Sequence, residues 1–366
     1  MSFYLILIVV STCLCCCYCF SHDQDIYDSS HGRKVIWFWL SALVVFLSMG
    51  LRYGIGTDYF YTYVPQYYKY LSEGKSSGKW EPLFKLLYLG LIKVTSNPQW
   101  VFVVTGAIIV GFVWLAILKL SPMPWFSVLL FFISRQYFIS LNVVRQYTGL
   151  AFVCLGFIFI KEKKYILYIV CAILGTLCHY STAIFIPVFL LAFIRIRPII
   201  GIALISIFSV FNGAIRDITR WIVSLTPYAK YLDSKYDLAD RYQGWTFFEM
   251  ILVFVLISIL LERDRIKENE HIIQFFYNLE MLCVFFSFNL NLVPNSDRIS
   301  WSLELPSIIL IPQVISRCRD KKERWLIIGV ICIVYSYVMY YRIFVLNDHE
   351  TVPYQIIPVI SAKIYA

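Results

Sequence analysis

The sequence predicts an all-α polytopic membrane protein, and three observations support this prediction. The 366-residue chain is 60% hydrophobic, with a mean hydropathy of +0.70, and a single soluble core of this size could not hide so much apolar surface. Only 15% of its residues are charged, against about 25% in soluble domains. The apolar residues form long continuous runs, as helices in lipid require, whereas the strands of a membrane barrel alternate apolar and polar residues.

About 11–13 transmembrane or re-entrant helices are expected within one integral membrane domain covering residues 1–366, because most apolar runs approach the length that crosses a bilayer. These runs lie at 2–20, 35–51, 83–94, 99–118, 124–141, 144–160, 165–178, 180–194, 199–215, 246–261, 272–293, 301–316 and 323–341. The run at 83–94 is only ~18 Å long as a helix and is expected to be re-entrant or interfacial. The first run lacks the basic start and cleavage site of a signal peptide, so we expect it to remain as a transmembrane helix.

Basic clusters set the expected orientation, because Lys and Arg collect in the cytoplasmic loops of membrane proteins. The formal net charge is +9, and four clusters share one side if residues 165–194 form a helical hairpin whose turn faces outward. The clusters lie at 161–164, 195–197, 263–267 and 317–324. The outer face then receives a loop at 52–80 with an amphipathic Tyr-rich helix, loops at 142–145, 216–245 and 294–300, and the C-terminal tail.

The first polar cluster follows the run at 35–51 and reads Arg52-Tyr53-Gly54-Ile55-Gly56-Thr57-Asp58-Tyr59. Its two glycines permit a tight backbone close to a ligand, and Asp58 with Thr57 is suited to cap the next helix. That helix has tyrosines at helical spacing, namely Tyr59, Tyr63, Tyr67 and Tyr70. They are interpreted either as an interfacial aromatic belt or as a sugar-binding surface. Arg52 and Asp58 either pair with each other or serve a ligand.

The second polar cluster opens a helix with Asn142, Arg145, Gln146 and Gly149, which share one helical face. A polar stripe on an apolar helix must face protein or water instead of lipid. Contact between helices is the alternative role for Asn142 and Gln146. The planar donors of Arg145 suit phosphate oxygens. Arg135-Gln136, ten residues earlier, is either unrelated to the site or a second contact with the ligand.

Two further polar residues lie near predicted turns. His179 stands at the hairpin turn, where its role is either structural or proton transfer in a wet cavity. Arg298 either pairs with Asp297 or contacts an anion. The 11 cysteines show no spacing typical of disulfides or a metal site. The sequence contains no nucleotide-binding or zinc-protease motif, and no basic surface typical of nucleic-acid binding.

Taken in order, several segments resemble the EpsG family, the Wzy-like polymerases of bacterial exopolysaccharide, capsule and O-antigen. The matching segments are 52–59, Glu81-Pro82-Leu83-Phe84, Asn142-Val143-Val144-Arg145-Gln146, His179-Tyr180-Ser181-Thr182-Ala183 and Val352-Pro353-Tyr354. The resemblance covers about residues 35–355 with roughly the family's usual spacing. Thr182 is a departure, because the family more often has Ala directly after the serine.

The resemblance implies a GT-C-like bundle in the bacterial plasma membrane that polymerises oligosaccharide repeat units carried on undecaprenyl pyrophosphate, at the outer face. No nucleotide sugar, cofactor or metal is expected. Besides the carrier-linked oligosaccharide and the bilayer, chain-length regulator and flippase proteins are candidate partners. The expected pyrophosphate ligands are Arg52, Arg145 and Arg298, because positive charge stabilises the leaving group. Asp58 and His179 are the candidate catalytic bases, and the other expected substrate contacts are Tyr59, Glu81, Asn142 and Gln146.

Three other functions fit parts of the pattern. An O-antigen ligase or a GT-C transferase using a polyprenyl-phosphate donor would act on a similar lipid carrier. A repeat-unit flippase is the transporter alternative, although the sequence shows no pair of related halves. A receptor or structural membrane protein is disfavoured by the clustered Arg, Asp and His residues.

Overall fold

The computed structural model describes residues 1–22, 31–74, 80–225, 229, 232, 244–263, 271–288 and 296–356. Within these ranges the chain is helical, with one isolated antiparallel bridge between Arg52 and Ile356. In chain order the helices are α1 (Ser2–His22), α2 (His31–Gly50), η1 (Tyr59–Tyr63), α3 (Val64–Glu73), α4 (Pro82–Ile92), α5 (Gln99–Leu120), α6 (Pro124–Ile133), α7 (Gln136–Asn142), α8 (Val144–Lys161), α9 (Tyr165–Cys178), η2 (Tyr180–Phe185), η3 (Pro187–Phe193), α10 (Pro198–Val210), α11 (Asn212–Ser224), α12 (Gly244–Arg263), α13 (His271–Phe288), α14 (Ser296–Glu304), α15 (Ser307–Ile315), α16 (Lys321–Met339), η5 (Tyr340–Val345) and η6 (Asp348–Glu350).

The prediction of an all-α membrane protein is confirmed in the described part of the chain. Four helices there are long and apolar enough to cross a bilayer, at Ser2–Phe20, Gln99–Leu120, Val144–Lys161 and Lys321–Val345. Two bent pairs raise this number to six, with α6 and α7 meeting at 55° and α10 and α11 at 75°. The shorter apolar helices are Val35–Gly50, Pro82–Ile92, Tyr165–Cys178, Tyr180–Phe193 and His271–Ser287. The predicted runs therefore appear largely as bent or short helices.

Prolines explain two of the differences from continuous helices. The run at 180–194 consists of two 3₁₀ segments, η2 and η3, and Pro187 opens the second. The run at 301–316 is divided into α14 and α15, with Pro306 as the N-cap of α15. A proline lacks the N–H that continues a helix and clashes with the preceding turn. The predicted loop at 216–245 begins inside α11, and most of its remaining residues lie outside the described ranges.

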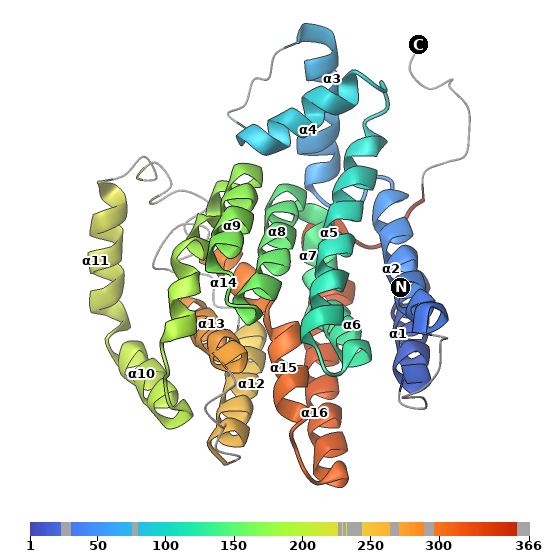
Figure 1. Cartoon of the computed structure of the whole chain (residues 1–366). Helices are drawn as coiled ribbons and strands as arrows, with labels where there is room; N and C mark the ends of the chain where they lie inside the picture. The colour runs from blue at the N-terminus through green and yellow to red at the C-terminus, as the bar shows by residue number, and fades with distance from the viewer. Residues whose placement is uncertain are drawn as a thin grey trace.

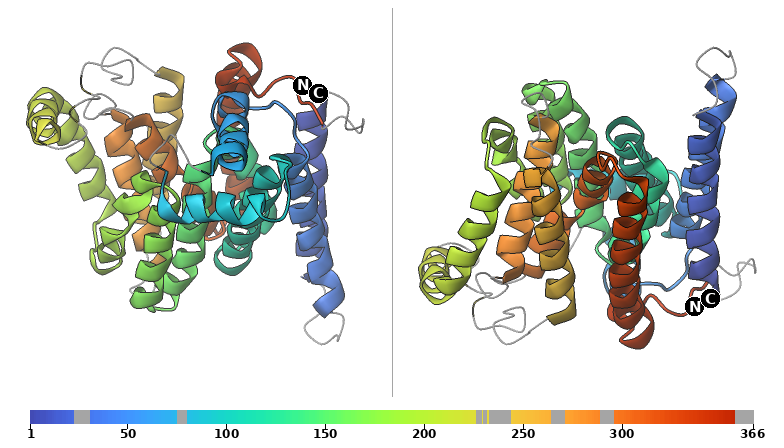
Figure 2. Two further views of the ribbon diagram at one scale, coloured as in Figure 1. Left: turned by 90° about the horizontal axis from the view of Figure 1, so that it is seen from above. Right: turned by 90° about the horizontal axis from the view of Figure 1, so that it is seen from below.

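A series of neighbouring helices forms the frame of the molecule. α1 packs on α2, α2 on α5, α5 on α8 and α8 on α9. Seen from above, α1 and α2 stand at one edge, and α10 and α11 stand at the opposite edge (Figure 2). The glycines Gly149 and Gly175 let α8 and α9 approach closely. A Cβ added at Gly149 would lie only 2.7 Å from the Gly175 carbonyl oxygen. Gly149 of the predicted polar stripe thus serves helix packing, as small residues do in membranes.

The predicted hairpin at 165–194 is present, with α9 as its first arm and the 3₁₀ segments as its second. The Tyr168 hydroxyl donates to the Phe185 carbonyl oxygen at 2.7 Å. Near the open end, the Tyr165 and Phe193 rings lie 4.8 Å apart. These contacts hold the two arms together and place His179 at the turn between them.

Candidate functional site

The basic clusters gather at one end of the bundle, opposite α3 and α4 (Figure 1). Arg197 pairs with Glu262 at 2.6 Å, and Arg263 pairs with Glu323. The Lys161 ammonium donates to the Lys119 carbonyl oxygen at 2.8 Å. We call this the basic end, defined by the described residues of 161–164, 195–197, 261–263 and 317–324. The grouping agrees with the prediction that the four clusters face one side of a membrane.

Several predicted site residues meet at the other end, which we call the α3–α4 end and define by Glu81, Asn142, Arg145 and His179. Arg145 lies in the first turn of α8, and its guanidinium pairs with the Glu81 carboxylate at 2.8 Å. Glu81 is the N-cap of α4 and also accepts from the Tyr180 N–H at 3.5 Å. The Arg145 side chain is 23% exposed. Glu81 thus holds Arg145 beside the hairpin turn while part of the Arg145 side chain stays exposed.

His179 ends α9 and begins η2, so two elements fix its backbone. Its Nδ1 accepts from the Ser181 N–H at 3.3 Å and lies 2.7 Å from the Ser181 hydroxyl. Burial, together with the charges of Arg145 and Arg298, lowers the pKa of His179 to about 3. At neutral pH the ring is therefore uncharged, and its proton is on Nε2. His179 is prepared to donate a hydrogen bond from Nε2.

Arg298 lies on α14 and is positioned through its backbone. The Gln146 side-chain amide donates to the Arg298 carbonyl oxygen at 2.9 Å and to the Ser302 hydroxyl at 2.7 Å. The charge of Arg298 acts on both His179 and His349. Gln146 therefore links α8 to α14 and holds Arg298 near the two histidines.

Asn142 connects the 52–58 loop to the C-terminal tail. Its Oδ1 accepts from the Thr57 hydroxyl at 2.8 Å and from the Asp58 N–H at 3.0 Å. Its Nδ2 donates to Nδ1 of His349 at 3.0 Å. The backbone continues this contact, since the Thr57 N–H donates to the His349 carbonyl oxygen at 3.2 Å. Gly56 needs its glycine here, because it has φ +91° and a Cβ would lie 2.9 Å from the Leu141 carbonyl oxygen.

His349 is a residue of this site that the sequence analysis missed. Its pKa is lowered to about 4 by burial and by the charges of Arg342, Arg298 and Arg135. Because its Nδ1 accepts from Asn142, the proton of the neutral ring is on Nε2, as in His179. The sequence feature that points to His349 is the family-like segment at 352–354, which begins three residues after it.

Asp58 is half-buried and lies at the N-cap of η1, but its side chain makes no capping hydrogen bond. It accepts from the Thr62 hydroxyl at 3.2 Å. Among the described residues, no ion pair joins Asp58 to Arg52, so the pairing considered from the sequence is not formed. A carboxylate without an ion pair, next to Asn142, is suited to accept a proton.

Arg52 lies deeper than the other predicted anion ligands. It is 2% exposed, and its guanidinium lies over the Phe102 ring at 4.9 Å. The aromatic hydroxyls near it belong to Tyr4, Tyr59, Tyr63 and Tyr137. Its backbone pairs with Ile356 of the tail. Arg52 thus supports the loop that holds Asp58, and its predicted contact with pyrophosphate stays a prediction.

The helically spaced tyrosines form a small core in place of a sugar-binding surface. Tyr59, Tyr63, Tyr67 and Tyr70 are buried with Phe84, Tyr88 and Phe102. The Tyr59 ring stacks on Phe102 at 4.4 Å, and its hydroxyl donates to Gln99 at 2.7 Å. Since Tyr59 is 3% exposed, we correct its predicted sugar contact to a packing role. The helical spacing does place the four tyrosines on one face, and that face packs against α4 and α5.

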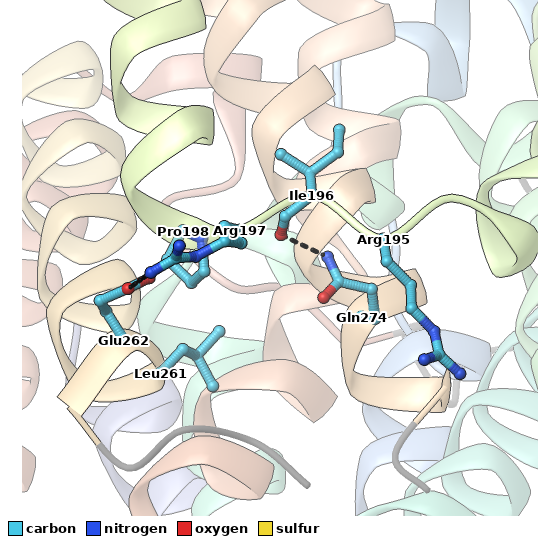
Figure 3. Close-up of a pocket in the computed structure, with 7 residues that line it drawn as sticks. All are labelled: Arg195, Ile196, Arg197, Pro198, Leu261, Glu262 and Gln274. Carbon is cyan, nitrogen blue, oxygen red and sulfur yellow. Dashed lines mark hydrogen bonds and ion pairs between the residues drawn. The ribbon is translucent and has the colours of Figure 1, made fainter. Parts of the chain in front are cut away.

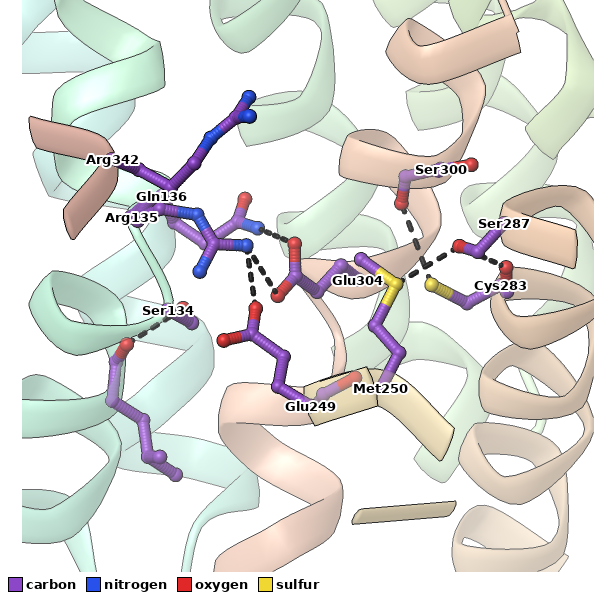
Figure 4. A network of polar contacts seen from close by, with 12 residues as sticks. Ser134, Arg135, Gln136, Glu249, Met250, Cys283, Ser287, Ser300, Glu304 and Arg342 are labelled. Atoms are coloured by element: carbon purple, nitrogen blue, oxygen red, sulfur yellow. Dashed lines mark hydrogen bonds and ion pairs between the residues drawn. The ribbon is translucent and has the colours of Figure 1, made fainter. Parts of the chain in front are cut away.

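Arg135 is a separate buried charge in the middle of the bundle, where α6 meets α7 (Figure 4). Its Nη2 lies 2.5 Å from Glu249 and 3.8 Å from Glu304. Gln136 donates to Glu304 at 3.0 Å and accepts from the Tyr147 hydroxyl at 2.7 Å. All of these side chains are buried. Arg135 and Gln136 therefore have a structural role, because their partners are other buried side chains of the bundle.

A cavity of about 460 Å³ opens at the basic end and not at the predicted site (Figure 3). It is lined by Arg195, Arg197, Glu262 and Gln274 among others. The Gln274 amide donates to the Ile196 carbonyl oxygen at 3.0 Å. None of the predicted site residues lines it. The described residues hold no group of three or more His, Cys, Asp and Glu side chains placed to bind a metal ion.

Comparison with known proteins identifies the family but offers no structural relative. Neither a curated protein nor a solved structure matches the chain, so the GT-C-like arrangement stays a prediction. The family model described as the EpsG family matches residues 35–356. This range includes the site residues from Arg52 to His349, and the chain belongs to the EpsG family.

Proposed function

We propose that this protein is a glycosyltransferase that polymerises oligosaccharide repeat units carried on undecaprenyl pyrophosphate at the outer face of the bacterial plasma membrane. Membership of the EpsG family supports an exopolysaccharide-related polymerase. The observation that carries the site assignment is the meeting of Arg145, His179 and Arg298 from three separate segments at the α3–α4 end.

This arrangement suits a diphosphate leaving group. Arg145 and Arg298 supply positive charge where negative charge develops. A guanidinium can donate two parallel hydrogen bonds to phosphate oxygens. The neutral His179 adds an N–H donor from Nε2. Glu81, Asn142 and Gln146 act in this proposal as positioning residues, because their described hydrogen bonds and ion pair hold Arg145, the Asp58 loop and Arg298.

The reaction exchanges one bond for another. The bond between the anomeric carbon of the growing chain and the pyrophosphate oxygen breaks, and that oxygen keeps the electron pair. A hydroxyl oxygen of the next lipid-linked repeat unit forms the new bond to the same carbon. Its proton passes to a base, for which we assign Asp58 in preference to His179. The hydrogen bond from the Ser181 N–H leaves Nε2 of His179 protonated, so that nitrogen donates.

The test is the length of polysaccharide made by Arg145→Ala and Asp58→Asn, measured on a gel and divided by the amount of inserted protein. Both variants are expected to abolish long chains while the protein still inserts. Normal ladders from both would show that the site assignment is wrong. Products extended by single additions from the unaltered protein would favour a ligase or a single-sugar transferase instead.

A further inference from the structure

A second cavity, of about 340 Å³, lies between α4, α5, α8 and α9. Its lining is almost entirely apolar and includes Leu87 and Gly90 of α4, Ile108 of α5 and Phe152 of α8. The Thr148 hydroxyl in its wall is already satisfied, because it donates to the Val144 carbonyl oxygen at 2.8 Å. The volume falls within the range of ligand pockets. With no polar group to recognise, this groove is suited to a hydrocarbon chain.

Three chain segments run directly from the anion site into the groove. Phe84 follows Glu81 at the start of α4, and Thr148 lies one turn after Arg145 on α8. Cys178 precedes His179, and its thiol is close enough to Glu81 for the two side chains to interact electrostatically. A single molecule with an anionic group beside Arg145 can therefore place an attached chain in the groove.

We propose that the groove holds the polyprenyl chain of the lipid carrier whose pyrophosphate lies between Arg145, His179 and Arg298. This inference rests on the proposed function. Two of the helices around the groove, α5 and α8, are long and apolar enough to cross a bilayer, and Leu86 in its lining is 62% exposed. A lipid tail can thus enter sideways from the membrane. The cationic site at its head end favours a carrier with a diphosphate over an ordinary phospholipid.

Gly90→Phe tests this proposal by filling the groove. A Cβ added at Gly90 meets no atom within 4 Å, so the new side chain starts in open space. Gly329→Phe is the matched control, because Gly329 lies in the membrane helix α16, has equally open space and does not line the groove. Binding of undecaprenyl pyrophosphate and of inorganic pyrophosphate is measured on the purified full-length protein.

Gly90→Phe is expected to weaken binding of undecaprenyl pyrophosphate at least about tenfold, since several methylenes of its chain are kept out of the apolar groove. Binding of inorganic pyrophosphate should not change, and Gly329→Phe should change neither. Unchanged binding of the carrier to Gly90→Phe would overturn the proposal. So would a Gly90→Phe protein that loses only co-purified phosphatidylglycerol. If the unaltered protein makes only single additions while Gly90→Phe still weakens carrier binding, the proposed function fails and the groove assignment stands.

Discussion

Two Arg-Gln pairs, at 135–136 and 145–146, have opposite surroundings in the folded protein. Arg135 lies between two glutamates, and its side chain is 5% exposed. Arg145 has one glutamate and is 23% exposed. Gln136 binds within the same buried network, whereas Gln146 reaches across to α14. The first pair is enclosed by its partners, whereas Arg145 of the second pair stays partly exposed beside His179.

The comparison shows that two similar sequence pairs differ in how many carboxylates surround the arginine and in how exposed its side chain is. We use this difference to assign a structural role to Arg135 and to propose a ligand-binding role for Arg145. A buried charge must be neutralised, because removing it from water costs several kcal/mol. Arg135 is neutralised within the fold, with carboxylates in excess. Within the described residues, Arg145 has its charge balanced by Glu81 alone, and its side chain stays partly exposed. The following predictions test this comparison, from the largest expected effect to the smallest.

Arg135→Ala is expected to have the largest effect, a loss of folded protein. The change leaves Glu249 and Glu304 buried without their cation, which costs about 3–5 kcal/mol. The amount of inserted protein and its unfolding temperature in detergent measure the effect. The control is the triple variant Arg135→Met, Glu249→Met, Glu304→Met, in which the whole network is replaced by apolar side chains. It should recover most of the stability and still polymerise; a stable but inactive triple variant would show that Arg135 has a chemical role.

Glu81→Gln should leave the protein folded but lower polymer formation about 10–100-fold, because a charged hydrogen bond to Arg145 worth ~1.5–3 kcal/mol is lost. Polymer made per unit of inserted protein is the measurement. Glu262→Gln, which affects a similar ion pair with Arg197 at the basic end, serves as the comparison and should have little effect. Equal losses from both variants would contradict the distinction between the two ends.

His179→Gln should retain more activity than His179→Phe, because the glutamine keeps a neutral N–H donor. The pH dependence sharpens this prediction. The folded protein keeps His179 neutral down to its lowered pKa of about 3, whereas in the unfolded chain the ring takes a proton near 6.5. The unfolded state therefore binds more protons between these values, and the free energy of unfolding falls as the pH drops through this window. Denaturation is measured at about pH 7.5, above the window, and at about pH 5, inside it. The loss of stability between these two values should be smaller for His179→Gln, and an identical loss would contradict the neutral, buried ring.

Asn142→Ala should have the smallest effect, confined to the contact between the loop and the tail. It removes the hydrogen bonds to Thr57, Asp58 and His349, which costs about 1–3 kcal/mol locally. Hydrogen exchange should increase in residues 52–58 and 347–356 and stay unchanged at the basic end. An increase spread over the whole bundle would mean that Asn142 supports the core instead.

Much of the fold followed from the sequence, because apolar length and basic clusters act locally. The hairpin turn at His179 and the grouping of the basic clusters were both predicted from the order of charges and apolar runs. The bends were not predicted. Arg135 adopts a left-handed backbone at φ 67°, where α6 meets α7, and its conformation depends on glutamates from distant helices. The apolar pattern of one segment does not predict which distant glutamates will contact its arginine.

The site was predicted in part. Arg145, His179 and Arg298 do come together, while Tyr59 and Arg52 turn into an aromatic core. The helical spacing of the tyrosines shows that they share a face, but only the packed structure shows that α4 and α5 cover it. His349 was missed because its contact with Asn142 joins residues far apart in the sequence. Glu249 and Glu304 were missed because they lie within the apolar runs at 246–261 and 301–316, whose composition predicts only helices.

An experimental structure of the protein with undecaprenyl pyrophosphate bound would test the site assignment most directly. The account predicts phosphate oxygens within hydrogen-bonding distance of Arg145, Arg298 and Nε2 of His179. Phosphates bound instead in the cavity at the basic end, beside Arg195 and Arg197, would contradict it.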